Sequence, residues 1–180
     1  LEKARSFLQR SVQTSGAVGY SDPAIYHHIM LSRMAQMEGD WEGAAQEMQQ
    51  AGNLARLMPP VMVREHVISQ QVRVELSFDR PAAARALLQA EGFGFEGGFR
   101  FPELPPEAPV TEPLGLLYNS ALRIVLHQAR KEKLPADLKK AVALAGVVLD
   151  GELRSRHLPA AMETLLLRGQ LRAALGEEQA

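Results

Sequence analysis

The chain has 180 residues, with 20 Lys and Arg against 21 Asp and Glu, so its formal net charge is -1. This balance argues against a basic nucleic-acid-binding module, and the absence of Cys excludes disulfides, zinc–thiolate sites and a catalytic thiol. No apolar run approaches the ~20 residues of a membrane-spanning helix. Since apolar residues still make up 46 % of the chain, we expect a soluble, cytoplasmic protein with a buried core and no membrane contact.

Apolar residues recur at three- and four-residue steps along most of the chain, which predicts an all-α fold. Prolines such as Pro81 and Pro135 open several of these stretches, where their missing N–H would be unpaired anyway. Asp22 and Asp40 are candidate N-caps. The expected helices cover residues 2–14, 23–38, 41–57, 60–77, 81–91, 113–131, 135–155 and 158–175.

The segment 92–112 breaks the helical pattern and is rich in Gly, Phe and Pro. Phe93 and Phe95 precede a Gly-Gly pair, and Phe99 and Phe101 follow it, which is compatible with a short hairpin. The alternative is a plain loop whose phenylalanines fill a gap between helical layers. The low stability of isolated hairpins favours the loop.

A repeat relates residues 35–51 to residues 74–90. A spacing of 39 residues aligns Asp40 with Asp79 and Ala44 with Ala83. A small residue after the turn lets two antiparallel helices approach closely. The pattern resembles the tetratricopeptide repeat, although Gln70 stands where that repeat has Leu. It predicts that Ala44 and Ala83 are buried between paired helices.

Three blocks follow in the second half: residues 117–130, residues 141–145 and residues 162–176. In this order they resemble the helical-repeat domain of MalT-type regulators, which are LuxR-family, ATP-dependent transcription activators. The resemblance spans residues 23–180. It implies a tetratricopeptide-like solenoid of antiparallel helix pairs with a right-handed superhelix, lying between an NTPase module and a helix-turn-helix domain of a longer protein.

Catalytic and phosphate-binding motifs are absent from the sequence. Residues 92–97 match G-x-G-x-x-G, but a helical stretch precedes them and no helix follows directly, so no dinucleotide site is expected. The adjacent His27 and His28 point about 100° apart on a helix and do not share a metal easily. We therefore expect no enzyme activity, no cofactor, no metal and no direct nucleic-acid contact.

The candidate ligand-binding residues follow from the expected stack. In tetratricopeptide-like folds the first helix of each pair turns one stripe to its partner and the opposite stripe to a concave groove. His28, Leu31, Ser32 and Ala35 form the expected packing stripe of the first pair. The groove residues are Tyr26, Arg33, Gln36, Glu65, Glu75, Asn119 and Arg123, with Ile29, Ile68 and Val72 as apolar neighbours. Such a mixture suits a polar small-molecule effector or a partner protein, and the alternative is that these faces are merely solvated.

Three functions stay open at this point. The first is an effector-sensing and protein-interaction domain of a MalT-type regulator, with residues 1–180 as one helical-repeat domain cut from a longer chain. The second is a free-standing tetratricopeptide-like scaffold that binds a peptide or partner protein. The third is an all-α enzyme whose site the motifs do not reveal. Self-association of the full-length protein is left open.

Overall fold

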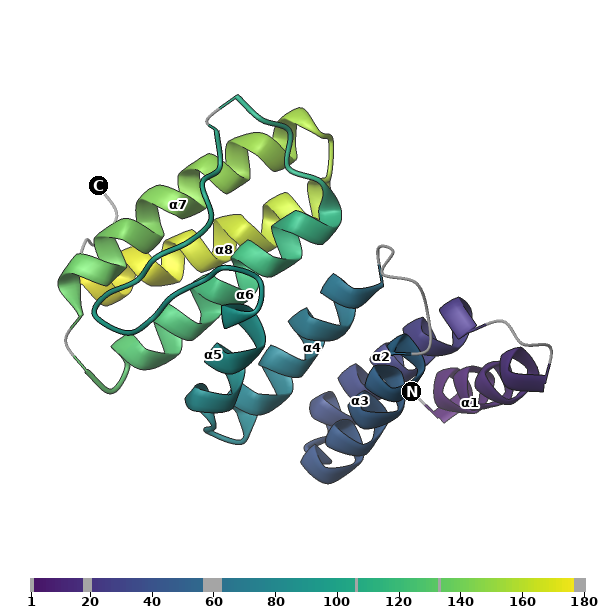
Figure 1. The fold of residues 1–180 in the computed structure, drawn as a ribbon. Coiled ribbons are helices and arrows are strands. Elements are labelled where there is room, and N and C mark those ends of the chain that lie inside the picture. Colours follow the sequence, from purple (N-terminus) through teal and green to yellow (C-terminus); the bar gives the residue numbers. More distant parts are fainter. Residues whose placement is uncertain (1, 18–20, 57–62, 106, 133, 177–180) are drawn as a thin grey trace. The chain divides into compact units, whose positions relative to one another are not determined.

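The computed structural model describes residues 2–17, 21–56, 63–105, 107–132 and 134–176. Their regular structure is helical (Figure 1): α1 (Glu2–Ala17), α2 (Ser21–Glu38), α3 (Trp41–Ala55), α4 (Arg64–Ser77), α5 (Pro81–Gln89), α6 (Glu112–Ala129), α7 (Pro135–Arg154) and α8 (Leu158–Leu175). Over these ranges the only extended pairing is a single antiparallel bridge between Gly94 and Arg100. The predicted all-α class is confirmed. The expected helix start at Pro60 and the side chain of Asp22 lie outside the described residues.

The chain divides into two compact units, Leu1–Phe78 and Asp79–Ala180. Helices α1 to α4 belong to the first unit, and α5 to α8 belong to the second. The second predicted helix pair, α4 with α5, is thus shared between the units. One helical-repeat domain over residues 1–180, with a right-handed superhelix, stays a prediction.

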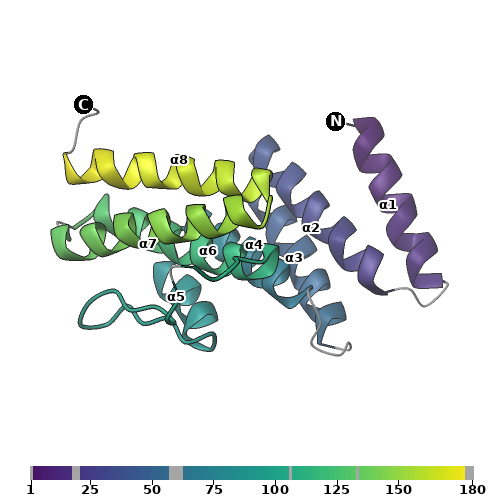
Figure 2. The same cartoon turned by 90° about the horizontal axis from the view of Figure 1, so that it is seen from above.

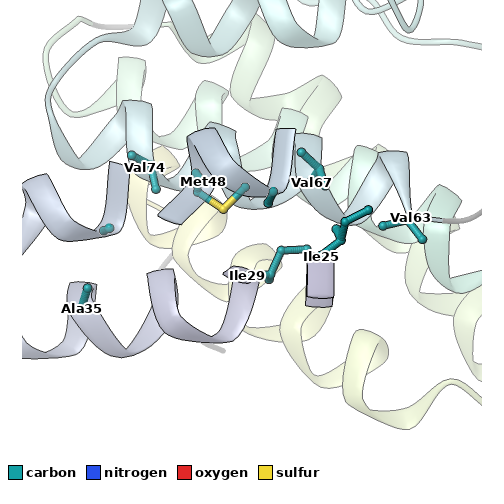
Figure 3. Packing of buried hydrophobic residues seen from close by; sticks show 9 residues of the cluster. Ile25, Ile29, Ala35, Met48, Val63, Val67 and Val74 are labelled. Carbon is teal, nitrogen blue, oxygen red and sulfur yellow. The ribbon is translucent and has the colours of Figure 1, made fainter. Parts of the chain in front are cut away.

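The first unit has its own apolar core, formed where α2 packs on α3 and α4. Ile25 and Ile29 of α2 point toward Met48 of α3 and Val67 of α4 (Figure 3). These residues recur at three- and four-residue steps, as the sequence pattern predicts for core-facing positions. Helix α1 packs on the outer side of this group through α2.

Helices α2, α4 and α7 end in the same kind of turn. In each turn one residue takes a positive φ and the next precedes the following helix: Gly39 (77°) and Asp40, Asp79 (57°) and Arg80, Arg156 (58°) and His157. A left-handed residue of this kind is a common way to stop a helix and redirect the chain. The fourth residue of the next helix is then a buried alanine whose amide donates to the capping carbonyl: Ala44 to Asp40 (3.0 Å), Ala84 to Arg80 (3.2 Å) and Ala161 to His157 (3.0 Å).

This turn corrects the predicted repeat by one residue. Asp79 corresponds to Gly39 and not to Asp40, so the spacing is 40 residues, Ala84 is fully buried and Ala83 is exposed. Asp79 holds the glycine-like position while its carboxylate accepts hydrogen bonds from Lys131 and His127. These hydrogen bonds lower the pKa of Asp79. A third copy of the turn lies between α7 and α8.

The corrected spacing predicts a large effect of substitution at Ala84 and a small one at its neighbour Ala83. Replacing Ala84 with Leu should overpack a buried contact and lower the free energy of unfolding by about 1–3 kcal/mol. The same change at Ala44 should have a similar effect, whereas Ala83→Leu should change stability by less than about 0.5 kcal/mol. Urea unfolding of the three variants tests this. If Ala83→Leu lowers the free energy of unfolding more than Ala84→Leu does, the 39-residue spacing is correct and the 40-residue spacing is wrong.

In the second unit, α7 and α8 pack against each other and both contact α6, while α5 packs on α6 (Figures 1 and 2). The segment between α5 and α6 crosses the face of α6 and α7 (Figure 1). Asp137 of α7 accepts a hydrogen bond from the Phe99 amide at 2.9 Å, and Tyr118 of α6 donates to the Pro102 carbonyl at 3.0 Å. The segment is therefore the predicted loop, pinned to the helices, with the Gly94–Arg100 bridge as its only hairpin-like element among the described residues.

Candidate ligand-binding face

Helices α2 and α4 are neighbours in the first unit. The ring of Tyr26 meets that of His66 edge-on, with 5.2 Å between centroids. Further along both helices, Gln36 is hydrogen-bonded to Gln70. Because the contacts advance together along the two helices, residues of α2 and α4 share one face. We call this the α2–α4 face: Tyr26, Arg33 and Gln36 of α2, with His66 and Gln70 of α4.

Gln70 organises the polar part of this face. Its side chain is fully buried, and Arg33 Nε donates to its Oε1 at 3.1 Å. Its Nε2 donates to Gln36 Oε1 at 3.1 Å and to Ser32 Oγ at 3.4 Å. The amide therefore uses its oxygen and both of its protons, as a buried amide must. Two of the predicted residues, Arg33 and Gln36, are thus held together by a residue that the sequence analysis treated only as a departure from the repeat.

The Gln70 network leaves hydrogen-bond donors available. Arg33 is engaged through Nε alone, so its two terminal nitrogens make no hydrogen bond or ion pair with the described residues. Gln36 is engaged through its oxygen and keeps its NH₂ group. Both side chains are half-buried, and their orientation is set by Gln70. This face presents donors to any molecule that carries oxygen acceptors.

Two further predicted groove residues, Glu65 and Glu75, belong to α4. Glu65 directly precedes His66 in the first turn of α4, and its Oε2 is shielded and makes no hydrogen bond among the described residues. Glu75 lies in the last turn of α4, half-buried and five residues beyond Gln70. Glu65 and Glu75 are each five residues from Gln70, about 140° away around the helix axis, so the structure does not bring these two predicted residues to the side of α4 that carries Gln70.

The expected apolar neighbours belong to the core. Ile29 is part of the α2–α3–α4 cluster, and Ile68 and Val72 are also buried. The reason is that α2 contacts both α3 and α4, and α4 contacts both α2 and α3, so the buried arc of each helix is wider than a single stripe. The predicted packing stripe is otherwise as expected: Leu31, Ser32 and Ala35 are buried, and His28 Nδ1 lies 2.7 Å from Glu47 Oε2 of α3.

Asn119 and Arg123 lie in the second unit, and neither is open to solvent as a groove residue should be. Asn119 is buried, and its Oδ1 accepts a hydrogen bond from the Thr164 hydroxyl of α8 at 2.9 Å. Arg123 is half-buried and forms an ion pair with Glu163 of α8, also at 2.9 Å. Helix α8 covers the face of α6 that the sequence alignment had assigned to the groove.

Other chemistry finds little support in the described residues. No group of three or more His, Asp or Glu side chains there could hold a metal ion. Gly94 of the G-x-G-x-x-G match is paired with Arg100, and the next helix begins only at Glu112. This is not the glycine turn at a helix N-terminus that a pyrophosphate needs. In the part of the chain that the structure describes, no helix is long and apolar enough to cross a membrane.

No family model matches this chain. No curated protein and no solved structure matches it at a significant level either.

Proposed function

We propose that the chain is a non-catalytic helical-repeat binding module, and that the α2–α4 face takes up a polar small molecule or a peptide segment of a partner protein. The observation that carries the proposal is the Gln70 network, which positions Arg33 and Gln36 from a neighbouring helix. A buried amide that orients two half-buried donor side chains is typical of a binding site whose residues are held in a fixed geometry.

The chemistry of the face indicates what it would bind. The terminal nitrogens of Arg33 and the NH₂ group of Gln36 are donors, so they match carboxylate, carbonyl or hydroxyl oxygens. Tyr26, supported edge-on by His66, offers a ring against which an apolar part of the ligand can pack. A few oriented polar groups beside an aromatic surface suit a small polar ligand or an extended peptide.

Within this proposal, the chain is the effector-sensing and interaction part of a MalT-type transcription regulator. The order of the blocks at residues 117–130, 141–145 and 162–176 supports this assignment. The consecutive helices, with a recurrent turn followed by a buried alanine, are compatible with this assignment. The gene that encodes the chain tests the assignment: an NTPase module upstream and a helix-turn-helix domain downstream are expected. A stop codon near residue 180 would favour the free-standing scaffold.

The binding face is tested with a double variant, Tyr26→Ala with Arg33→Ala. A thermal-shift screen of defined sugars, nucleotides, amino acids and short peptides first identifies a ligand of the wild-type chain. A ligand at 100 times its Kd adds about 2.7 kcal/mol of stability, which gives a clear rise in Tm. The double variant should lose at least tenfold in affinity, because it removes the terminal donors and the ring together. Because Tyr26 packs against the core and Arg33 is a partner of Gln70, circular dichroism and the Tm of the variant are measured first to establish that it is folded.

Arg172→Ala is the matched control, because Arg172 is an exposed arginine of α8 in the second unit. It should leave both the Tm and the affinity unchanged. Unaltered affinity in a folded Tyr26→Ala/Arg33→Ala variant would place the ligand elsewhere and reject the α2–α4 face as the binding site.

A further inference from the structure

Glu152 of α7 is a carboxyl group with no exposure to solvent (0 %). Its Oε2 lies 2.6 Å from the Thr164 hydroxyl of α8, and that hydroxyl lies 2.9 Å from Oδ1 of Asn119 in α6. Gly115 of α6 leaves room for the other oxygen, because a Cβ at that position would lie 2.6 Å from Glu152 Oε1. The three polar side chains therefore join the three helices α6, α7 and α8.

The hydrogen bonds of Thr164 require an additional proton. Its hydroxyl oxygen lies near three acceptors: Glu152 Oε2, Asn119 Oδ1 and, at 3.1 Å, the Ala160 carbonyl. A threonine hydroxyl donates a single proton. An ionised Glu152 would add only a further acceptor. A protonated Glu152 supplies the donor, since its O–H can bond to Thr164 and leave the threonine proton for Asn119 or Ala160.

Turning the Asn119 amide does not remove the difficulty. Its NH₂ group would then donate to Thr164 and free the threonine proton for Glu152. The carboxylate would still be buried with a full negative charge and only one hydrogen bond, the one from Thr164, because Glu152 Oε1 has no partner among the described residues. Burying a carboxylate without a cation or several donors is strongly unfavourable. The neutral acid avoids this penalty.

The charged groups around Glu152 do not neutralise it. Burial is the main cause that raises its pKa; the hydrogen bond with Thr164 lowers it, Glu163 of α8 raises it further, and His157 of the α7–α8 turn lowers it, with a net rise. Arg123 of α6 is ion-paired with Glu163. Arg154 of α7 donates to a backbone carbonyl in the segment before α6. No cation among the described residues forms an ion pair with Glu152.

We propose that Glu152 is protonated in the folded protein, donates its proton to Thr164, and makes the packing of α6, α7 and α8 dependent on pH. The proton is taken up when the three helices come together and is released when they separate. The second unit then contains a proton-sensitive link, formed by Glu152, Thr164 and Asn119, between α6, α7 and α8.

The sign of the effect follows from which state binds the proton. The unfolded chain loses it above the ordinary glutamate pKa of 4.5, while the folded state retains it because its pKa is raised. The stabilisation that protonated Glu152 contributes is fully present below the pKa of the unfolded chain. It is lost as pH rises toward and through the pKa of the folded state. In that window the unfolding equilibrium constant rises by up to about tenfold per pH unit.

Urea unfolding of the full 180-residue chain tests the proposal when wild type and Glu152→Gln are compared between about pH 5 and about pH 8. Amide hydrogen exchange in α6–α8 shows which part of the measured unfolding belongs to the second unit. The glutamine amide can donate to Thr164 and does not titrate, so the ratio of the wild-type to the variant unfolding constant should rise with pH. Asp150→Asn, which changes an exposed carboxylate on the same helix, should keep the wild-type pH dependence.

An infrared titration of the wild-type chain gives a second readout that does not depend on the folding of Glu152→Gln. A protonated carboxyl band should persist above about pH 6, where exposed carboxyl groups are ionised. Thr164→Val, which removes the acceptor, should shift that band. A ratio of unfolding constants that does not change with pH, or a wild-type spectrum without the band, overturns the proposal.

Discussion

Replacing Phe99 with alanine is expected to lower the free energy of unfolding of the second unit by about 3–5 kcal/mol. The ring is buried between Phe95 and Phe101, with centroid distances of 5.8 Å and 5.3 Å. The backbone at Phe99 is tied to α7, because its amide donates to Asp137 at 2.9 Å. A segment held in this way cannot collapse freely into the cavity, so most of the lost packing should appear as lost stability.

Urea unfolding with hydrogen exchange of α6–α8 measures this loss. Phe7→Ala is the matched control, since Phe7 of α1 is 62 % exposed and its removal should change stability by less than about 0.5 kcal/mol. If Phe99→Ala and Phe7→Ala have the same small effect, the segment between α5 and α6 is not part of the core.

Ile29→Ala is expected to lower the free energy of unfolding of the first unit by about 2–5 kcal/mol. Ile29 lies in the cluster between α2, α3 and α4, near Met48 and Val67 (Figure 3). The neighbouring Met30 is 41 % exposed, so Met30→Ala should have a much smaller effect. The pair is compared by urea unfolding, with hydrogen exchange of α2 and α3 as the local readout. A ligand-facing Ile29 would give the opposite result: near-native stability together with weakened binding.

The helices could be predicted closely because their signals are local. Apolar spacing, the prolines that open α5 and α7, and the Asp40 cap each act within a few residues, and Asp40 does accept a hydrogen bond from the Gly43 amide at 2.9 Å. The exact repeat spacing could not be predicted in the same way. Asp79 takes a positive φ that a sequence normally signals with Gly, and its partners Lys131 and His127 are distant in the chain.

The candidate site could be predicted only in part. Arg33 and Gln36 were found from helical position, and the structure brings them together through Gln70. Gln70 could have been found as well, since a glutamine among the apolar positions of a helix needs buried partners. Asn119 and Arg123 were misplaced because the packing of α8 on α6 is a tertiary contact, which local spacing does not indicate. The buried acid at Glu152 was missed for the same reason.

The most direct test of the central claim is an amide-resolved NMR titration of the wild-type chain with a ligand from the thermal-shift screen. The proposed function predicts that the largest shift changes fall in α2 around residues 26–36 and in α4 around residues 65–75. The same titration of the Tyr26→Ala/Arg33→Ala variant should show them strongly reduced. Changes confined to α6–α8 or to the segment between α5 and α6 would contradict the assignment of the α2–α4 face as the binding site.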